Sequence, residues 1–317
     1  MDTCARQRRA AVVGADGFIG RHLTTALTDL GPQVSLYNRR REPRWPDDLV
    51  APEIVFYLAT SITPALAEER PELVTADHLG LAQLLHRLAR SPCPPTVVLT
   101  SSAGTVYDPD MTGRCREDAP TRATSRYGAA KLALERLLLE YAGVIPSVIL
   151  RLSNVYGPGQ RMGKGQGVLA YWLSSALAGD PLLMIGDPGT TRDYVYIDDV
   201  VDCLLRVALN EPAAGGTIPT VLNVGSGTST SLATLLSTVE FVVGRDLPVR
   251  RLPGRRVDRR ETSLDVNGAA RQLGWRPRTS LTNGVAAMWR ELLVVNQRAS
   301  NGAGTPVATL VGNDLSP

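Results

Sequence analysis

Strand-like and helix-like segments alternate along the first half of this chain. Short apolar runs are separated by longer segments whose apolar residues recur at helical spacing. In chain order they are a strand at 10–13, a helix at 19–30, strands at 34–37 and 54–58, a helix at 72–90, a strand at 96–100, a helix at 127–141 and a strand at 147–152. Short strands that are apolar on both faces are typical of a sheet covered by helices on both sides. The alternation therefore predicts an α/β fold with a doubly wound parallel sheet.

The alternation weakens after about residue 157, where glycine-rich loops and short strands such as 221–224 take over. The charged, proline-rich segment 39–53 predicts a loop. The polar composition of the C-terminal end cannot bury enough apolar surface to order it. The expected units are a nucleotide-binding domain at 8–157, a smaller substrate lobe at 158–295 from which the chain can cross back to the first domain around 190–210, and a disordered tail at 296–317.

A glycine-rich turn connects the first predicted strand to the first predicted helix. Gly14, Gly17 and Gly20 are spaced three apart, so the turn can be tight and the first backbone amides of the helix stay open. Such amides can bind a pyrophosphate, because the N-terminal end of a helix carries partial positive charge. Glycine turns of this kind also occur for packing alone, and the spacing differs from the GxGxxG dinucleotide pattern. Within the alternating pattern, the turn predicts a dinucleotide site.

The residues after the second strand carry no carboxylate. In dinucleotide-binding domains, an acidic side chain at this place usually binds the adenosine ribose hydroxyls. Here the sequence is Asn38-Arg39-Arg40-Arg41, and guanidinium groups pair well with a 2′-phosphate. The segment therefore favours NADPH over NAD, with a solvated basic turn as the alternative.

Tyr127 and Lys131 are four residues apart in the predicted helix 127–141, so their side chains share one face. A nearby cation favours the ionised form of a phenol, and we expect Lys131 to lower the pKa of Tyr127 toward neutrality. Such a tyrosine can exchange a proton with a substrate. A hydroxyl after the preceding strand could hydrogen-bond the same substrate oxygen. The candidates are Thr100, Ser101, Ser102 and Thr105.

Several motifs occur in the order found in one enzyme family. They are Gly14-x-x-Gly17-x-x-Gly20, Thr105-Val-Tyr107, Tyr127-x-x-x-Lys131, Arg151-Leu-Ser-Asn-Val-Tyr-Gly-Pro-Gly159, Arg192-Asp-Tyr-Val195 and Leu273-Gly-Trp-Arg-Pro277. In these motifs the chain resembles the extended short-chain dehydrogenase/reductase family, of the NAD-dependent epimerase/dehydratase type acting on nucleotide sugars. The resemblance covers about residues 10–293. It implies a Rossmann-like sheet with a smaller C-terminal substrate-binding lobe.

The resemblance also implies NAD(P) on the first domain and a nucleotide sugar in the cleft. Tyr127 is then the acid/base, Lys131 contacts the nicotinamide ribose, and a serine or threonine completes the triad. The expected catalytic residues are Ser102, Thr105, Tyr127 and Lys131. The expected cofactor contacts are Gly14, Gly17, Phe18, Ile19, Gly20, Asn38, Arg39, Arg40, Leu58, Ala59, Thr60, Tyr127, Lys131, Leu152 and Val155. The expected substrate contacts are Ser102, Ala103, Asn154, Arg192 and Arg256, of which the last three approach the diphosphate.

Two features depart from the family pattern. Relatives commonly place the catalytic hydroxyl at the position that Ala103 occupies here, which leaves Ser102, preferred, or Thr105 to serve. The segment 39–53 is short where family members usually have a further strand and an acidic residue near the adenine. The arginines at 250–260 fit a diphosphate, with a solvated edge as the alternative.

Three functions are compatible with these residues. No Asp or Glu occurs in 100–107, which argues against a dehydratase, because elimination needs a separate acid and base. We expect NADPH-dependent reduction of the 4-keto group of an NDP-4-keto-deoxysugar, with Tyr127 as the proton donor. The first alternative is an NDP-hexose 4-epimerase, like those acting on UDP-glucose and UDP-galactose, with tightly bound NAD. The second alternative is a nucleotide-binding regulator without catalysis.

Composition limits the partners. The 317 residues carry 34 Lys and Arg against 31 Asp and Glu, and a net charge of +3 argues against a nucleic-acid or membrane-surface binder. No apolar run approaches the roughly 20 residues of a membrane span, and the N-terminus does not resemble a signal peptide, so we expect a cytoplasmic protein. The scattered four cysteines and three histidines predict no metal site. The resemblance implies a dTDP- or UDP-linked sugar as substrate and a homodimer that pairs the helices at 72–90 and 127–141.

Overall fold

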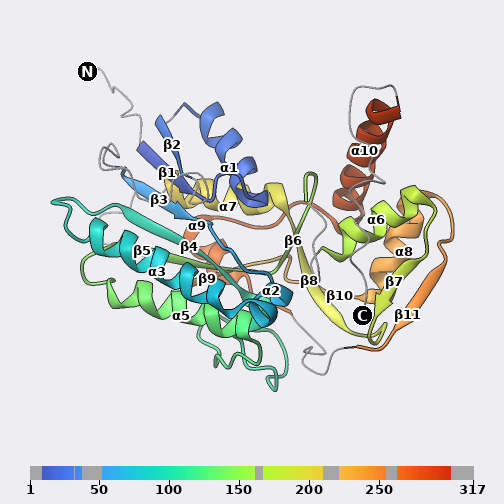
Figure 1. Ribbon diagram of the computed structural model, residues 1–317, viewed down its shortest axis with the longest axis horizontal. Coiled ribbons are helices and arrows are strands. Elements are labelled where there is room, and N and C mark those ends of the chain that lie inside the picture. Colours follow the sequence, from blue (N-terminus) through green and yellow to red (C-terminus); the bar gives the residue numbers. More distant parts are fainter. Residues whose placement is uncertain are drawn as a thin grey trace.

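Six parallel strands form the central sheet of the protein. In the computed structural model they are β1 (Arg9–Val13), β2 (Gln33–Tyr37), β3 (Ile54–Tyr57), β4 (Thr96–Ser102), β5 (Ser147–Leu152) and β9 (Val221–Val224). Their order across the sheet is β2-β1-β3-β4-β5-β9 (Figure 1). The structure describes residues 9–31, 33–37, 52–160, 167–209, 221–254 and 263–300. The predicted parallel α/β sheet is confirmed.

Helices cover both faces of this sheet, as the alternation predicted. One face carries α1 (Phe18–Asp29) and α7 (Ile197–Leu209), and the other carries α3 (Pro71–Leu88) and α5 (Arg126–Glu140). Successive residues of a strand point to opposite faces, so in β1 Ala10 and Val12 pack with α1, while Ala11 and Val13 pack with α3. An apolar layer therefore packs against each face of the central sheet. Two short helices, α2 (Pro64–Glu69) and α4 (Ala103–Val106), follow the ends of β3 and β4.

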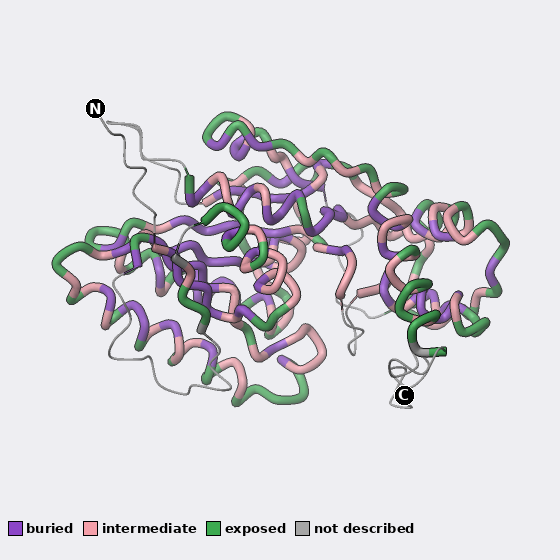
Figure 2. Tube along the Cα trace, turned by 90° about the horizontal axis from the view of Figure 1, so that it is seen from above, coloured by how far each residue is buried: buried purple, intermediate pink, exposed green. Residues whose placement is uncertain are grey.

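A smaller lobe lies beside the sheet (Figure 1). It contains β6 (Asn154–Tyr156), α6 (Val168–Ala178), β7 (Leu182–Ile185), β8 (Thr191–Tyr196), β10 (Ser229–Ser231), α8 (Leu232–Val243), β11 (Val249–Leu252) and α10 (Leu281–Ser300). In this lobe β10, β8 and β6 form one small sheet, and β11 pairs with β7 in another. Figure 2 shows buried residues inside both parts of the molecule and exposed residues on the outer turns of the helices.

The chain returns from the lobe to the first domain. Helix α7 packs against α1, strand β9 pairs with β5 at the edge of the central sheet, and α9 (Asn267–Leu273) packs near β9. The segment beyond residue 157 thus completes the first domain. The division of the chain between residues 157 and 158 remains a proposal. In that division, strand β9 and helix α7 come from the second unit and pack in the first.

Two expectations about loops and tail meet different outcomes. Helix α10 continues through Ser300, so residues 296–300 are helical although the sequence analysis assigned them to a disordered tail. Its earlier turns are anchored by buried Val285 and Met288, and a helix already nucleated extends at low cost. Most of the expected loop 39–53 lies outside the described residues.

A loop after β6 links both ends of the described chain. The backbone N–H of Gly159 donates to Glu291 Oε2 of α10 at 2.7 Å. Its carbonyl accepts from Arg21 Nη2 of α1 at 2.9 Å, and the other terminal nitrogen of Arg21 donates to the Asp16 carbonyl at 3.0 Å. The start of α1 and the last helix are therefore fixed to one another through Gly159.

Asp199 attaches the segment before α10 to α7. Its carboxylate accepts the backbone N–H groups of Arg278 and Thr279, each at 3.0 Å. Its backbone carbonyl accepts Trp275 Nε1–H at 2.8 Å, and the Trp275 side chain is fully buried. One residue thus anchors this segment through both its side chain and its backbone.

We expect Asp199→Ala to lower the free energy of unfolding by about 1–3 kcal/mol, because two N–H groups lose their acceptor. Urea unfolding measures this change. Asp198→Ala removes the same charge from the exposed neighbour on the same helix and serves as the control. Equal losses for the two variants would contradict the role given to Asp199.

Candidate active site

The glycine turn lies at the C-terminal end of β1 and packs against the end of β3. Gly14 has φ +91°, and a Cβ atom there would lie 2.8 Å from the Ala59 backbone nitrogen. A Cβ atom on Gly20 would collide with the carbonyl oxygen of Gly14. Gly17 caps α1 without a side chain, so no side-chain oxygen occupies the first amides of the helix. These observations describe a cradle lined by backbone, of the kind that fits a pyrophosphate.

The other expected cofactor residues in the described chain gather at the same edge of the sheet. Leu58 donates its N–H to the Val13 carbonyl at 2.9 Å, which fixes the strand following β3 beside the glycine turn. The remaining ones belong to the first turn of α1, to the segment after β3 and to the ends of β5 and β6, namely Phe18, Ile19, Ala59, Thr60, Leu152 and Val155. Asn38, Arg39 and Arg40 lie outside the described residues. Strand β2 ends at Tyr37, which is in register with Val13.

Tyr127, Lys131 and Ser102 come together where α5 crosses the end of β4. Ser125 caps α5 by accepting the Gly128 N–H at 3.1 Å. Lys131 Nζ lies 5.7 Å from the centre of the Tyr127 ring and donates to the Thr100 carbonyl at 3.4 Å. The side chain of Ser102 acts on the Tyr127 hydroxyl and lowers its pKa. Because Tyr127 and Lys131 are four residues apart on α5, both side chains lie at the end of β4.

The two remaining candidates near Tyr127 have other surroundings. Thr105 Oγ1 donates to the Ser102 carbonyl at 3.5 Å, so its hydroxyl is turned toward backbone. Ala103 is buried in α4 and carries no hydroxyl. A Cβ atom on Gly128 would collide with the Thr105 carbonyl oxygen, so this glycine allows α5 to approach α4 closely. Of the two hydroxyls that the sequence left open, that of Ser102 is the one that affects the pKa of Tyr127.

The expected direction of the Tyr127 pKa is wrong for this structure. Burial raises the pKa of Tyr127 to about 12, the hydrogen bond from Ser102 opposes this rise, and the negative charge of Asp77 adds to it. The Lys131 ammonium lies over the ring rather than at the hydroxyl, and burial lowers its own pKa while Asp77 and Glu135 oppose that change. Tyr127 is therefore protonated at neutral pH.

A buried ion pair supports the helix that carries Tyr127. Arg151 of β5 binds Glu135 of α5 through two nitrogens, with Nη2 to Oε2 at 2.7 Å and Nε to Oε1 at 3.1 Å. Ser101 of β4 donates to the same carboxylate. Burial disfavours the charge of Arg151, but the hydrogen bonds and charge of Glu135 outweigh it and raise the arginine pKa. The guanidinium carbon also lies 4.9 Å from the centre of the Tyr107 ring.

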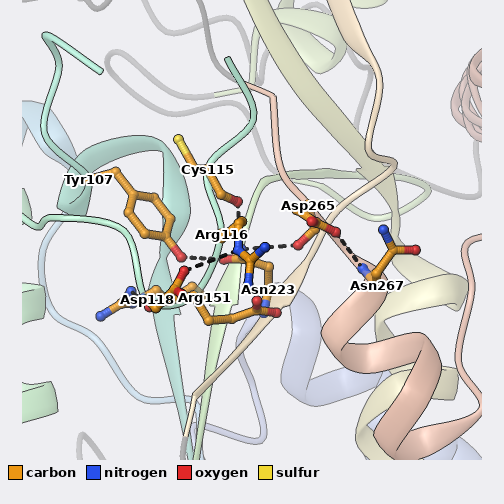
Figure 3. Close-up of polar contacts among 9 residues, drawn as sticks. Tyr107, Cys115, Arg116, Asp118, Arg151, Asn223, Asp265 and Asn267 are labelled. Atoms are coloured by element: carbon orange, nitrogen blue, oxygen red, sulfur yellow. Dashed lines mark hydrogen bonds and ion pairs between the residues drawn. The ribbon is translucent and has the colours of Figure 1, made fainter. Parts of the chain in front are cut away.

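Tyr107 begins a buried polar network that Figure 3 shows. Its hydroxyl donates to Asn223 Oδ1 at 2.6 Å. Asn223 Nδ2 donates to the carbonyls of Cys115 at 2.9 Å and Asp265 at 3.2 Å. The backbone of Cys115 also forms an isolated β-bridge with that of Leu264. The network thus joins the end of β9 to two long loops at the edge of the site.

The expected substrate residues Asn154 and Arg192 lie on adjacent strands of the lobe. Asn154 of β6 is in register with Tyr194 of β8, and its Nδ2 donates to the Asp193 carbonyl at 3.0 Å. Arg192 Nη1 donates to the Thr191 carbonyl at 2.8 Å. The structure brings these two together, whereas Arg256 lies outside the described residues.

The sequence analysis missed one buried charge near Tyr127. Asp77 of α3 is 1% exposed and lies on the apolar stripe of its helix, four residues after Leu73 and four before Leu81. A carboxylate at a core position is rare unless it is paired or hydrogen-bonded, so this placement was the available signal.

None of the helices in the described part of the chain is long and apolar enough to cross a membrane. Within the same residues, no three His, Cys, Asp or Glu side chains are grouped in a way that could hold a metal ion.

We expect Gly14→Ala to destabilise the protein more than Gly31→Ala, which has a similar φ of +82° but open space around its Cβ position. Both variants carry the left-handed strain of roughly 1–2 kcal/mol. Gly14→Ala also forces a shift of the Ala59 backbone, for about 1–3 kcal/mol more. Calorimetric unfolding compares them, and equal losses would contradict the close contact between the glycine turn and β3.

Comparisons with known proteins support a single family. A model of the NAD dependent epimerase/dehydratase family matches residues 10–225. UDP-glucose 4-epimerase of Mycolicibacterium smegmatis is 32% identical over 88% of this chain and 96% of its own. The dTDP-6-deoxy-L-talose 4-dehydrogenase (NAD(P)(+)) of Kitasatospora kifunensis is 30% identical over 89% of this chain and 94% of its own. The structure of Thermus thermophilus UDP-glucose 4-epimerase with NAD has a TM-score of 0.79 at 26% identity, covering 89% of this chain and 98% of that chain.

These matches agree with the motifs and with the parallel sheet. The family model spans more than half of the chain, and both relatives match over nearly their whole length. The resemblance seen in the sequence is thereby confirmed, and this chain belongs to the NAD dependent epimerase/dehydratase family, a family of enzymes.

Proposed function

We propose that the protein reduces the 4-keto group of an NDP-4-keto-deoxysugar with NADPH. The observation that carries this proposal is the placement of Tyr127 and Lys131 together beside Ser102 at the end of β4, with Lys131 Nζ 5.7 Å from the centre of the Tyr127 ring. These side chains lie at the sheet edge that also holds the glycine turn, because the carboxyl ends of parallel neighbouring strands meet there. A proton donor next to a dinucleotide cradle suits reduction of a carbonyl.

The cofactor proposal rests on two parts of the chain. The side-chain-free cradle at Gly14, Gly17 and Gly20 fits a pyrophosphate. The residues directly after β2 are Asn38-Arg39-Arg40, whose sequence lacks the carboxylate that would repel a 2′-phosphate. The nicotinamide group, when bound, supplies the hydride. The Thermus thermophilus relative is an NAD complex, so the choice of NADPH depends on this sequence segment.

In the proposed reaction, each residue near Tyr127 has a separate task. Tyr127 donates its proton to the oxygen that becomes an alkoxide, a contribution of roughly 10²–10⁴ in rate. Ser102 hydrogen-bonds that oxygen and holds it in place. Lys131 contributes positive charge, which stabilises the tyrosinate left after proton donation. Asn154, Arg192 and Arg256 bind the diphosphate of a dTDP- or UDP-linked sugar, for which arginine forks are suited.

A 4-epimerase is the second candidate, and the M. smegmatis and T. thermophilus relatives favour it. The M. smegmatis relative, named a UDP-glucose 4-epimerase, matches over 96% of its length. The K. kifunensis relative, named a 4-dehydrogenase using NAD(P)(+), matches over 94% of its length and favours net oxidoreduction. An epimerase would first oxidise the sugar and return the hydride, so it would show no net use of cofactor.

The deciding experiment mixes purified protein with NADPH and a dTDP-4-keto-6-deoxyhexose, with NADH and UDP-glucose in parallel. We expect one NADPH consumed per sugar reduced. Tyr127→Phe should lower the rate by about 10²–10⁴. Tyr141→Phe, at the end of the same helix, is the matched control and should keep the rate.

The alternative outcomes are distinct. Interconversion of hexoses without net use of cofactor, together with copurifying NAD, would make the protein an epimerase. Tight NADPH binding without turnover of any sugar would make it a nucleotide-binding regulator. An unchanged rate in Tyr127→Phe would remove Tyr127 from the reaction.

We also propose a homodimer that pairs α3 and α5 with their copies. These helices lie side by side, and Leu79 of α3 and Leu139 of α5 are 54% and 41% exposed. Burying such side chains favours association. Sedimentation should give a dimer, and Leu79→Arg with Leu139→Arg should give a monomer. Phe241→Arg on α8, where the side chain is 76% exposed, is the control that should leave the dimer intact.

A further inference from the structure

Four charged side chains are buried around the reacting tyrosine. Two are anionic and two are cationic, and they are Asp77, Lys131, Glu135 and Arg151. Glu135 is bound by Arg151 through paired hydrogen bonds. A buried ammonium needs an opposite charge nearby, because leaving water costs several kcal/mol per ion. Among these four, Asp77 is the second anion available to Lys131.

Asp77 is bound to the segment that follows β3, and Lys131 is bound near the end of β4, the neighbouring strand. The Asp77 carboxylate accepts the Ser61 N–H at 2.8 Å and the Thr60 hydroxyl at 3.1 Å. Thr60 and Ser61 follow β3, and Lys131 contacts the Thr100 carbonyl near the end of β4. Strands β3 and β4 are neighbours, so these two points of attachment lie side by side.

Helix α3 and Tyr127 pack against the same small apolar cluster. Leu73, Val74 and Tyr127 all pack against the buried side chains of Ile62, Ala67 and Ala130. Asp77 lies on the turn of α3 that follows Leu73 and Val74. Its negative charge raises the pKa of both Tyr127 and Lys131, which is the expected effect of a nearby carboxylate on a phenol and on an ammonium.

Other charged groups near Tyr127 come from the three helices packed there. They are Glu68 of α2, Glu72 and His78 of α3, and Arg126, Lys131 and Glu135 of α5. Arg126 and Glu68 pair with each other at 3.3 Å on the surface, where solvent screens them. Glu72 is exposed and binds Arg70. Asp77 differs from these acidic groups of α2 and α3 in being buried.

We propose that Asp77 is a positioning residue of the active site, which balances the buried charge of Lys131 and holds segment 60–61 beside the tyrosine. This inference rests on the proposed proton donation by Tyr127. In the proposed reaction, Tyr127 is neutral at the start and donates its proton. The negative charge of Asp77 favours the positive charge of Lys131, which stabilises the tyrosinate that forms.

The first test is a double-variant cycle on thermal unfolding, which needs no substrate. Asp77→Asn leaves Lys131 without its counter-charge, and Lys131→Met leaves Asp77 without its own. We expect the melting temperature of the double variant to fall by less than the sum of the decreases in the two single variants, because the stability effects of substitutions at interacting residues are not additive. Additive losses would overturn the charge balance.

The matched control is Glu72→Gln, which removes a carboxylate from the exposed side of the same helix. Combined with Lys131→Met, it should give additive losses. If it gave the same non-additivity as Asp77→Asn, a general charge effect of α3 would replace the specific pairing.

The second test follows tyrosinate absorbance with pH in each protein and in its Tyr127→Phe counterpart, so that the difference reports Tyr127 alone. Asp77 raises the pKa of Tyr127, and removing its charge lowers that pKa. We expect the Tyr127 signal to begin about one pH unit lower in Asp77→Asn than in the native protein. An unchanged onset in a folded variant would overturn the electrostatic role.

The two tests also separate this inference from the proposed function. Failure to turn over any nucleotide sugar would refute the proposed reaction, while the unfolding cycle and the titration would still decide on Asp77. If a nucleotide sugar is reduced, the alkaline limb of the pH–rate profile should move to lower pH in Asp77→Asn. Glu72→Gln should leave the limb in place.

Discussion

The Glu135–Arg151 ion pair fixes the geometry on which the active site depends. It connects α5 to β5, and Ser101 extends the connection to β4. Tyr127 and Lys131 belong to the same helix as Glu135, so the pair sets the height and rotation of both relative to the strand ends. A buried pair of this kind stabilises little beyond its own desolvation, but losing one partner is costly. It therefore acts as a locating contact more than as a source of stability.

The site is assembled from groups whose properties oppose one another. Burial disfavours the charges of Lys131 and Arg151, and nearby carboxylates oppose this effect. Burial and the Asp77 charge also keep Tyr127 neutral. The site thus places a neutral acid beside a buried lysine whose positive charge is supported by carboxylates. That combination suits a proton donor whose product is an anion, in agreement with the reduction proposed for this member of the family.

The sequence predicted most of the first domain, because its signals are local. Strands such as Val97–Leu99 are apolar on both faces, and the four-residue spacing of Tyr127 and Lys131 placed both at one strand end. The predicted direction of the Tyr127 pKa shift was wrong, because the spacing of two residues reveals neither their burial nor the charge of Asp77. The partner of Val221–Val224 was also beyond local reasoning, since an apolar run does not specify which strand it joins. Asn38, Arg39, Arg40 and Arg256 stay predictions.

The position of β9 at the sheet edge has a consequence for the order in which the chain can fold during synthesis. The edge of β5 and the apolar side of α1 stay uncovered until residues 197–224 have left the ribosome. Gly159, which already accepts from Arg21, gains its second partner only when Glu291 of α10 has been made. The first domain is encoded first but lacks its edge strand until residues 221–224 are made, so a nascent chain leaves the edge of β5 open from the synthesis of residue 152 to that of residue 224.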